Sequence, residues 1–203
     1  NKLRFYSMNF EKLGVIESSL EELVPAKEAG WTNYPKGVMW AFGEKGMKVP
    51  SGMDLMLYGN IPNGSGLSSS AAYETLVGNI FNHFCCEDKL DPVTIAKIGQ
   101  YAENVYFGKP CGLMDQMGSS VGGMLTIDFA APGAPVIEKV DFDLTAAGYA
   151  LCIIDSGADH ADLTDEYAAV PNELKGICAH FGRSVLREVS GPELFAALPE
   201  LRR

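Results

Sequence analysis

The sequence has no apolar run long enough to span a membrane, and no basic-then-apolar leader opens it. Basic residues are also scarce, since 16 Lys and Arg stand against 26 Asp and Glu, for a formal net charge of −10. Binding to nucleic acid or to an anionic membrane needs a basic surface that neutralises phosphates. We therefore expect neither a nucleic-acid nor a membrane partner.

Cysteine is sparse and odd in number. The five cysteines are Cys85, Cys86, Cys111, Cys152 and Cys178. They lack the spacing of a disulfide scaffold, which favours reduced thiols in the cytoplasm over disulfides. A hydrophobic content of 47% with 21% charged residues is that of an ordinary globular protein. The 203 residues suffice for one domain with a core, or for one domain and part of another.

Strand and helix patterns are mixed along the chain without a regular βαβ repeat, which predicts an α+β fold. Strands are expected at residues 3–8, 53–59, 124–129, 136–140 and 149–154. Helices are expected at residues 32–43 and 69–84, from Asp91–Pro92 onward and, with an interruption at Pro171, from about residue 160.

Two of the expected helices carry an apolar stripe. In the helix 69–84 the stripe is Ala72, Leu76, Val77, Ile80, Phe81 and Phe84, and the residues expected to face away from it are Glu74, Thr75, Asn79 and Asn82. The helix that begins at Asp91–Pro92 is expected to bury Ile95, Ile98, Ala102 and Val105.

A loop rich in glycine and serine connects the expected strand 53–59 to the helix 69–84. Gly64 and Gly66 lack side chains, so backbone N–H groups can approach an anion closely. The serines at 68–70 fall on the first helical turn, where unpaired N–H groups and the helix dipole favour negative charge. The loop is neither a Walker A motif nor a dinucleotide fingerprint. A turn with a serine cap needs no ligand, but the full pattern favours a nucleotide phosphate chain.

Three motifs carry a resemblance to a known family. The string 62–72, Pro-x-Gly-x-Gly-Leu-Ser-Ser-Ser-Ala-Ala, resembles the second signature of the GHMP small-molecule kinases. Residues 31–38 are similar to the galactokinase block Trp-x-Asn-Tyr-x-Lys-Gly-Val, and residues 111–116 to its block Cys-Gly-Ile-Met-Asp-Gln. The resemblance covers most of residues 31–128 and points to the galactokinases within that family.

The resemblance implies a fold and an activity. The fold would be the two-domain GHMP kinase fold, with an N-terminal domain like the second domain of ribosomal protein S5 and an α+β C-terminal domain. The activity would be transfer of the ATP γ-phosphoryl group to the anomeric hydroxyl of galactose with Mg²⁺, giving galactose 1-phosphate. Catalysis would come mainly from positioning and electrostatic stabilisation.

The resemblance also implies roles for single residues. Asp115 would be the catalytic carboxylate that accepts or orients the proton of the attacking hydroxyl. Glu103 would bind Mg²⁺ together with Ser69 or Ser70, Ser70 being preferred by alignment, because hard oxygen ligands suit this cation. Outside the family frame, the alternative for Asp115 is a turn or cap residue, and the alternative for Glu103 is a surface helix residue.

The other implied contacts are to the nucleotide and the sugar. Nucleotide contacts are expected from Pro62, Gly64, Ser65, Gly66, Leu67, Ser68, Ser69, Ser70, Trp31 and Tyr34. For the two aromatic residues, the alternative is plain core packing. Sugar contacts are expected from Gly112, Asp115 and Tyr167.

Two alternatives to galactokinase stay open. The segment 155–160 has two acidic residues and no basic residue before His160, which departs from the galactokinase pattern and favours a different acceptor, such as an amino sugar. A non-catalytic sensor of nucleotide and sugar is the other alternative, and the retained Asp115, Glu103 and serines argue against it.

Two further chemistries are rejected. His83, Cys85 and Cys86 are interpreted as core residues rather than a metal cluster, because no second ligand pair accompanies them. Cys111 is not interpreted as a nucleophile, because no motif places a His to activate it.

Two other family signatures are missing from the sequence: the arginine-containing segment that ends in Glu-His-x-Asp, and the C-terminal glycine-rich segment. We therefore expect a fragment of a longer protein, with little or no kinase activity by itself. Residues 1–157 are expected to belong to the N-terminal ATP-binding domain, and residues 158–203 to the beginning of the C-terminal domain.

Overall fold

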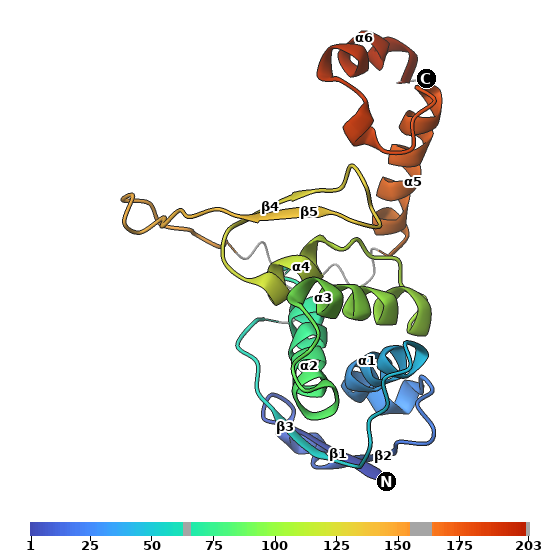
Figure 1. Ribbon diagram of the computed structural model, residues 1–203, viewed down its shortest axis with the longest axis vertical. Helices are drawn as coiled ribbons and strands as arrows, with labels where there is room; N and C mark the ends of the chain where they lie inside the picture. The colour runs from blue at the N-terminus through green and yellow to red at the C-terminus, as the bar shows by residue number, and fades with distance from the viewer. Residues whose placement is uncertain (63–65, 155–163, 202–203) are drawn as a thin grey trace. The chain divides into compact units, whose positions relative to one another are not determined.

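The computed structural model describes residues 1–62, 66–154 and 164–201, which form two compact units. The described residues up to Gly122 form the first unit and those from Gly123 onward the second (Figure 1). The mixture of helices and strands in the chain confirms the predicted α+β class. The expected domain boundary after residue 157 lies outside the described residues and stays a prediction.

The first unit contains a three-stranded sheet in the order β2-β1-β3. Its strands are β1 (Lys2–Ser7), β2 (Ile16–Ser19) and β3 (Asp54–Leu57). β1 pairs antiparallel with β2 and parallel with β3, with Phe5 opposite Ile16 on one side and Leu55 on the other. Side chains alternate between the two faces, so that Leu3 and Phe5 are fully buried while Lys2 and Arg4 are exposed.

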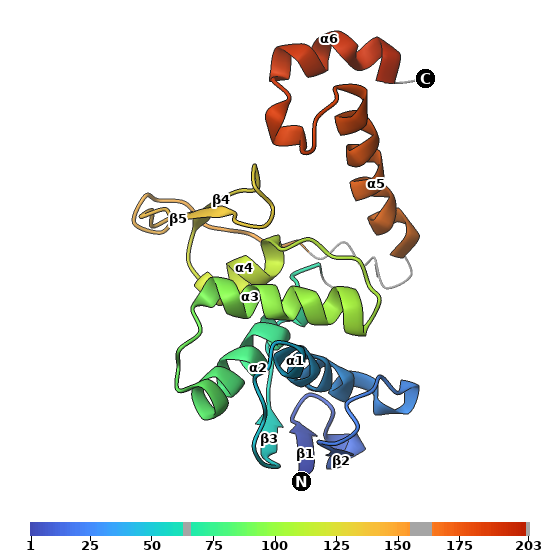
Figure 2. The ribbon, with the colours of Figure 1, turned by 45° about the vertical axis from the view of Figure 1, so that its right-hand side comes forward.

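Four helices complete the first unit: α1 (Asn33–Glu44), α2 (Ser69–Cys86), α3 (Pro92–Tyr101) and α4 (Met114–Val121). Short 3₁₀ turns lie at Glu11–Leu13 and Lys27–Thr32, and a π-helical turn, Ala102–Tyr106, follows α3 directly. Figures 1 and 2 show α1 and α2 over one side of the sheet. The core between them consists of Leu3, Phe5, Val38, Met39, Ala41, Phe42, Leu55, Leu57, Val77, Phe81, Ile98 and Ala102.

The predicted stripe of the helix 69–84 is only partly right. Val77 and Phe81 are buried as expected, but Leu76 is 45% exposed and Phe84 is 69% exposed. Three polar residues predicted to face away are buried instead: Glu74, Thr75 and Asn82. α2 is enclosed on several sides by α1, α3 and α4, and each of these polar side chains has a hydrogen-bond partner inside the unit.

The prediction for the helix after Asp91–Pro92 is right up to the π-helical turn. Ile95, Ile98 and Ala102 are buried, but Val105 is 52% exposed. An extra residue in the turn shifts the angular position of everything after it, so Tyr106 is buried in the place expected for Val105. The same part of the helix buries the side chain of Glu103.

The second unit contains a two-stranded antiparallel sheet and two helices. The strands are β4 (Leu125–Asp128) and β5 (Val136–Lys139), and the helices are α5 (Thr164–His180) and α6 (Gly191–Leu201), with a 3₁₀ turn at Leu186–Glu188 between the helices. Pro171 lies inside α5, so the expected interruption of that helix is wrong. Arg187 Nε donates to Asp128 Oδ2 at 3.2 Å.

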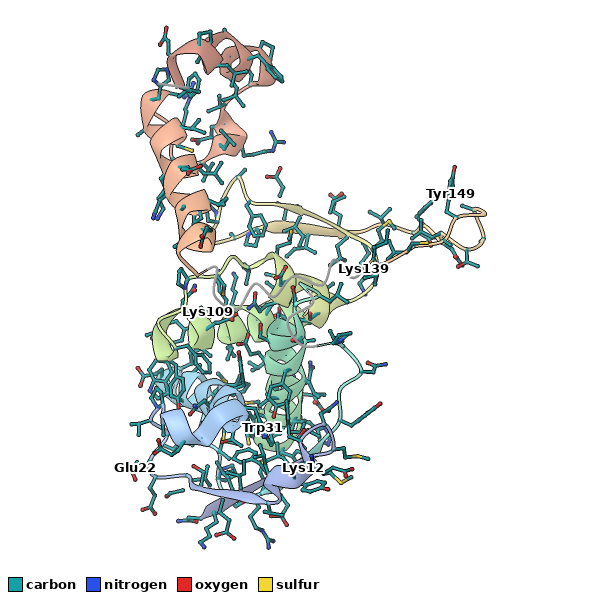
Figure 3. The ribbon with its side chains drawn as sticks, turned by 180° about the vertical axis from the view of Figure 1, so that it is seen from behind. Lys12, Glu22, Trp31, Lys109, Lys139 and Tyr149 are labelled. Atoms are coloured by element: carbon teal, nitrogen blue, oxygen red, sulfur yellow. The ribbon has the colours of Figure 1, made fainter. Side chains whose placement is uncertain are left out.

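The expected strand at residues 149–154 is also wrong. The segment has no strand partner among the described residues, and pairing is what defines a strand. Its side chains are exposed, Leu151 at 79% and Ile154 at 88%, and Figure 3 shows Tyr149 pointing outward. In the described part of the chain, no helix combines the length and the apolar character needed to cross a membrane.

Candidate active site

The glycine-serine loop ends in an unusual backbone conformation. Gly66 has a φ of 74°, and Ser68, the residue before α2, has φ 56° and ψ 44°, which is left-handed. A non-glycine residue rarely adopts this conformation and is strained by it. Of the other loop residues expected to bind nucleotide, Pro62 and Leu67 are exposed, and Gly64 and Ser65 lie outside the described residues.

The start of α2 has the properties of an anion-binding helix end. The Ser68 side chain forms no capping hydrogen bond to the first turn, whose N–H groups have no intrahelical partner. Ser69 and Ser70 lie in that first turn and are half-buried. Because α2 is 18 residues long, its dipole adds to the attraction of the free N–H groups for a negative charge.

Instead of capping α2, the Ser68 hydroxyl reaches the start of α4. Its Oγ donates to Asp115 Oδ2 at 2.6 Å, although the two residues are 47 positions apart in the sequence. Asp115 lies in the first turn of α4 and is exposed, so its carboxylate can be reached by a ligand. The fold thus brings together the phosphate-loop motif and the carboxylate that sequence analysis assigned to catalysis.

Glu103 lies on the π-helical turn and is 3% exposed. Lys109 Nζ lies 3.3 Å from its Oε1, and Gln116 Nε2 donates to its Oε2 at 3.0 Å. π-Helical turns occur often at functional sites. Burial lowers the pKa of Lys109, but the charge and hydrogen bond of Glu103, together with smaller contributions from Tyr34 and Glu74, outweigh it. The net effect raises the pKa of Lys109, so the ammonium keeps its charge at neutral pH.

The donor set expected for Mg²⁺ consists of hard oxygens: one Glu103 carboxylate and the hydroxyls of Ser69 and Ser70. Among the described residues, no group of three or more His, Cys, Asp and Glu side chains could hold a metal ion alone. Mg²⁺ usually takes one or two protein carboxylates and completes its shell with phosphate and water, so this sparse set fits it in type. The metal-binding role of these residues stays a prediction.

Glu74 and Gln116 form a buried polar pair next to Glu103, and sequence analysis gave neither of them a role. Both are 1% exposed, and Gln116 Nε2 lies 3.3 Å from Glu74 Oε2. Burial, reinforced by the charge of Glu103, raises the pKa of Glu74 to about 9. Glu74 is therefore neutral at pH 7. The polar residue types placed Glu74 on an exposed helix face, so only the tertiary structure reveals the pair.

The two aromatic residues expected at the adenine pocket belong to an aromatic cluster. Trp31 lies between the helices and the sheet, with its ring centroid 6.2 Å from those of Phe5 and Tyr73 (Figure 3). Tyr34 packs 5.0 Å from Phe107, centroid to centroid. These contacts are those of the core-packing alternative, and adenine binding by the two residues stays a prediction.

The residues expected to contact the sugar are placed differently. Gly112 is exposed and precedes α4, and a Cβ added to it would meet no atom within 4 Å, so it borders open space near Asp115. Tyr167 lies on α5, and its side chain is outside the described residues. The segment 155–160, which departs from the galactokinase pattern, is outside them as well.

The two chemistries rejected from the sequence concern Cys111 and the group of His83, Cys85 and Cys86. Cys111 is partly buried, and burial together with Glu103 raises the pKa of its thiol, which disfavours the nucleophilic thiolate. His83 is 63% exposed and pairs with Asp88 at 2.8 Å, so it is a surface residue rather than the core residue expected. Cys85 and Cys86 are half-buried free thiols, and the hydrophobic core packs against both.

Known proteins match this chain in the region of the site. Residues 33–123 match the family model "GHMP kinases N terminal domain". The galactokinase of Streptococcus mutans is 49% identical over 120 residues, which are 59% of this chain and 30% of that protein. The galactokinase of Ligilactobacillus salivarius is 48% identical over 122 residues, which are 60% of this chain and 31% of that protein.

A solved structure resembles nearly the whole chain. The crystal structure of Lactococcus lactis galactokinase complexed with galactose matches with a TM-score of 0.76 and 28% identity, covering 98% of this chain and 52% of that one. The chain therefore spans about half the length of this solved relative and under a third of the two curated ones. The matched region 33–123 contains the glycine-serine loop, Glu103 and Asp115.

Proposed function

We propose that the protein is a galactokinase, because residues 33–123 match the family model of the GHMP kinase N-terminal domain. It transfers the γ-phosphoryl group of ATP to the anomeric hydroxyl of galactose, giving galactose 1-phosphate. The observation that carries the proposal is the 2.6 Å hydrogen bond from Ser68 Oγ to Asp115 Oδ2. It joins the expected phosphate loop to an exposed carboxylate, the two groups that a sugar kinase has to hold side by side.

The first part of the proposed site binds the phosphates. The N–H groups of the first turn of α2, with the Ser69 and Ser70 hydroxyls, bind the phosphate chain of ATP. Lys109 keeps its positive charge beside Glu103 and offsets part of the site's negative charge. Glu103 and a serine hydroxyl would hold Mg²⁺, and the cation would supply neutralisation of phosphate charge.

The second part activates the acceptor. The Asp115 carboxylate accepts the hydrogen bond of the sugar's anomeric hydroxyl and takes its proton as the oxygen attacks the γ-phosphorus. The bond from Ser68 occupies one carboxylate oxygen, Oδ2, and leaves the other, Oδ1, for the acceptor. The backbone of Gly112, with open space beside it, lines the acceptor position.

The proposed protein acts in the cytoplasm on small molecules. All five cysteines are free thiols in the structure, which suits a reducing compartment.

The test is the activity of the intact protein with ATP, Mg²⁺ and a panel of acceptors that includes galactose and galactosamine. Galactose should have the highest kcat/KM, and Asp115→Ala should lower kcat by about 10²- to 10⁴-fold, the usual contribution of a positioned acid or base. Binding of ATP should survive this substitution. A preference for galactosamine would identify a different acceptor, and binding of both ligands without turnover would identify a sensor; either result overturns the proposal.

A further inference from the structure

We propose that Gln116, held in place by Glu74, is a positioning residue. It orients the Glu103 carboxylate for metal binding and fixes the first turn of α4, which carries Asp115. The inference rests on the proposed function, because it concerns the expected metal ligand and the expected catalytic carboxylate. It extends that function to two residues with no assigned role.

The Gln116 amide connects three elements of the fold. Its Nε2 carries two N–H groups, and Oε2 of Glu103 and Oε2 of Glu74 lie 3.0 Å and 3.3 Å from this nitrogen. The Cys111 sulfur, at 3.7 Å, is a third and weaker contact. Gln116 comes from α4, Glu74 from α2 and Glu103 from the π-helical turn, so the amide ties the three segments around the site to one another.

The Glu103 carboxylate is held from two sides. Gln116 fixes Oε2, while Lys109 approaches Oε1 and also donates its backbone N–H to the Glu103 carbonyl at 3.0 Å. Glu103 is 3% exposed, whereas the side chain of Lys109 is 53% exposed. Gln116 is thus the rigid, interior partner and Lys109 the one that can move away. An oriented carboxylate binds a metal at a lower entropic cost than a free one.

The polar pair is a costly way to fill space. Glu74 and Gln116 are 1% exposed, and each has one buried oxygen, Oε1, without a hydrogen-bond partner among the described residues. A buried polar atom left unpaired costs free energy, and apolar side chains of the same volume would pack without that cost. The arrangement is therefore explained better by orientation of Glu103 than by packing.

The surrounding backbone makes room for the pair. A Cβ added to Gly99 of α3 would lie 3.3 Å from Glu74 Cβ and 3.4 Å from Gln116 Cγ. α3 can approach both side chains because this position carries no side chain of its own. Gln116 also follows Asp115 directly, so an amide fixed at Gln116 limits movement of the Asp115 backbone.

The test measures how much Mg²⁺ strengthens binding of a non-hydrolysable ATP analogue to the full chain, by calorimetry with and without the metal. In Gln116→Leu and Glu74→Leu this strengthening should fall by about tenfold or more, the usual effect of removing a residue that orients a metal ligand. Metal-free binding should stay within about twofold, because the first turn of α2 is intact. Asn79→Ala, which removes an exposed amide on the same helix, is the matched control.

Three further variants separate positioning from packing. Glu74→Gln keeps a hydrogen-bond acceptor for Gln116, so Mg²⁺ should still strengthen nucleotide binding nearly as much as in the wild type. A variant with a folding defect would lose this strengthening. Glu103→Gln should lose the effect, and adding Gln116→Leu to it should cause no further loss, since Gln116 acts through Glu103. If Gln116→Leu does not fold by circular dichroism, the Glu74→Leu and Glu74→Gln pair decides.

The outcomes distinguish the two proposals. In one outcome, Mg²⁺ strengthens binding of the ATP analogue as much in folded Gln116→Leu or Glu74→Leu as in the wild type. That outcome overturns the positioning role and leaves the kinase proposal standing. A wild-type chain that binds no nucleotide with or without Mg²⁺ overturns the site itself, and the positioning role with it.

Discussion

Replacement of Glu74 by Gln should remove a strong pH dependence of stability from the first unit. Burial and the nearby charge of Glu103 raise the pKa of Glu74 to about 9, against an ordinary value of 4.5 in the unfolded chain, because the opposing effects of Gln116 and Lys109 are smaller. Between these two values the folded protein keeps a proton that the unfolded chain loses. Unfolding therefore releases one proton in this window, and stability falls as the pH rises.

The magnitude follows from one proton. A difference of one bound proton changes the free energy of unfolding by about 1.4 kcal/mol per pH unit. Over the two pH units from pH 6 to pH 8 the change is roughly 3 kcal/mol. The contribution of Glu74 is complete below pH 4.5 and is lost as the pH approaches 9. Glutamine has the shape of the protonated acid and no proton to lose, so Glu74→Gln should be close to the wild type near pH 5 and more stable than it at pH 8.

The assay is urea unfolding at several pH values, followed by tryptophan fluorescence. Both tryptophans of the chain, Trp31 and Trp40, lie in the first unit, so the signal reports on the part that contains Glu74. Glu44→Gln, an exposed position on α1, is the control and should keep the wild-type slope. Equal losses of stability from pH 6 to pH 8 in the wild type and in Glu74→Gln would refute a neutral, buried Glu74.

Two other predictions concern backbone positions. Gly99→Ala should destabilise the first unit by about 1–3 kcal/mol, the usual cost of overpacking, because its Cβ would lie 3.3 Å from Glu74 Cβ. Gly118→Ala on α4 should be neutral or stabilising by up to about 1 kcal/mol, because its Cβ would have no atom within 4 Å. Urea unfolding measures both changes. Equal effects of the two would contradict the close approach at Gly99. Glu87→Gly should raise stability by about 0.5–1 kcal/mol, because Glu87 ends α2 with a left-handed φ of 54° that glycine adopts without strain, and its exposed ion pair with Lys89 contributes little. An unchanged or lower midpoint of thermal unfolding would speak against strain at this position.

The elements of the first unit were predictable where periodicity was strong. The expected strands at 3–8 and 53–59 and helices at 32–43 and 69–84 correspond to β1, β3, α1 and α2. The short β2 was not predicted, because four residues carry too little pattern to identify a strand. The failure at 149–154 has the opposite cause, since apolar residues in a row satisfy a strand pattern whether or not a neighbouring strand is present to pair with them.

The motif residues of the site were predictable, but their supporting residues were not. Asp115 and the serines at 68–70 stand in family motifs, and the structure joins them through Ser68. Glu74 was placed on the exposed side of its helix because periodicity treats every acidic residue as solvated. A buried acid becomes visible only when a partner such as Gln116, 42 positions away, is found beside it in space.

Three departures from regular structure lie at the proposed site. Ser68 is left-handed, Glu103 lies on a π-helical turn, and Glu74 is a buried acid; each costs free energy and none improves the core. Two of these departures place a functional oxygen where regular helical geometry would not place it. In a helical conformation, Ser68 would direct its hydroxyl along α2 rather than to Asp115. Without the π-helical turn, Glu103 would be rotated away from Gln116. Such local costs persist when they serve a function rather than stability. Departures of this kind support the location of the site where family motifs accompany them, as at Ser68 and Glu103, and they carry no such meaning at Glu87, where no motif is present.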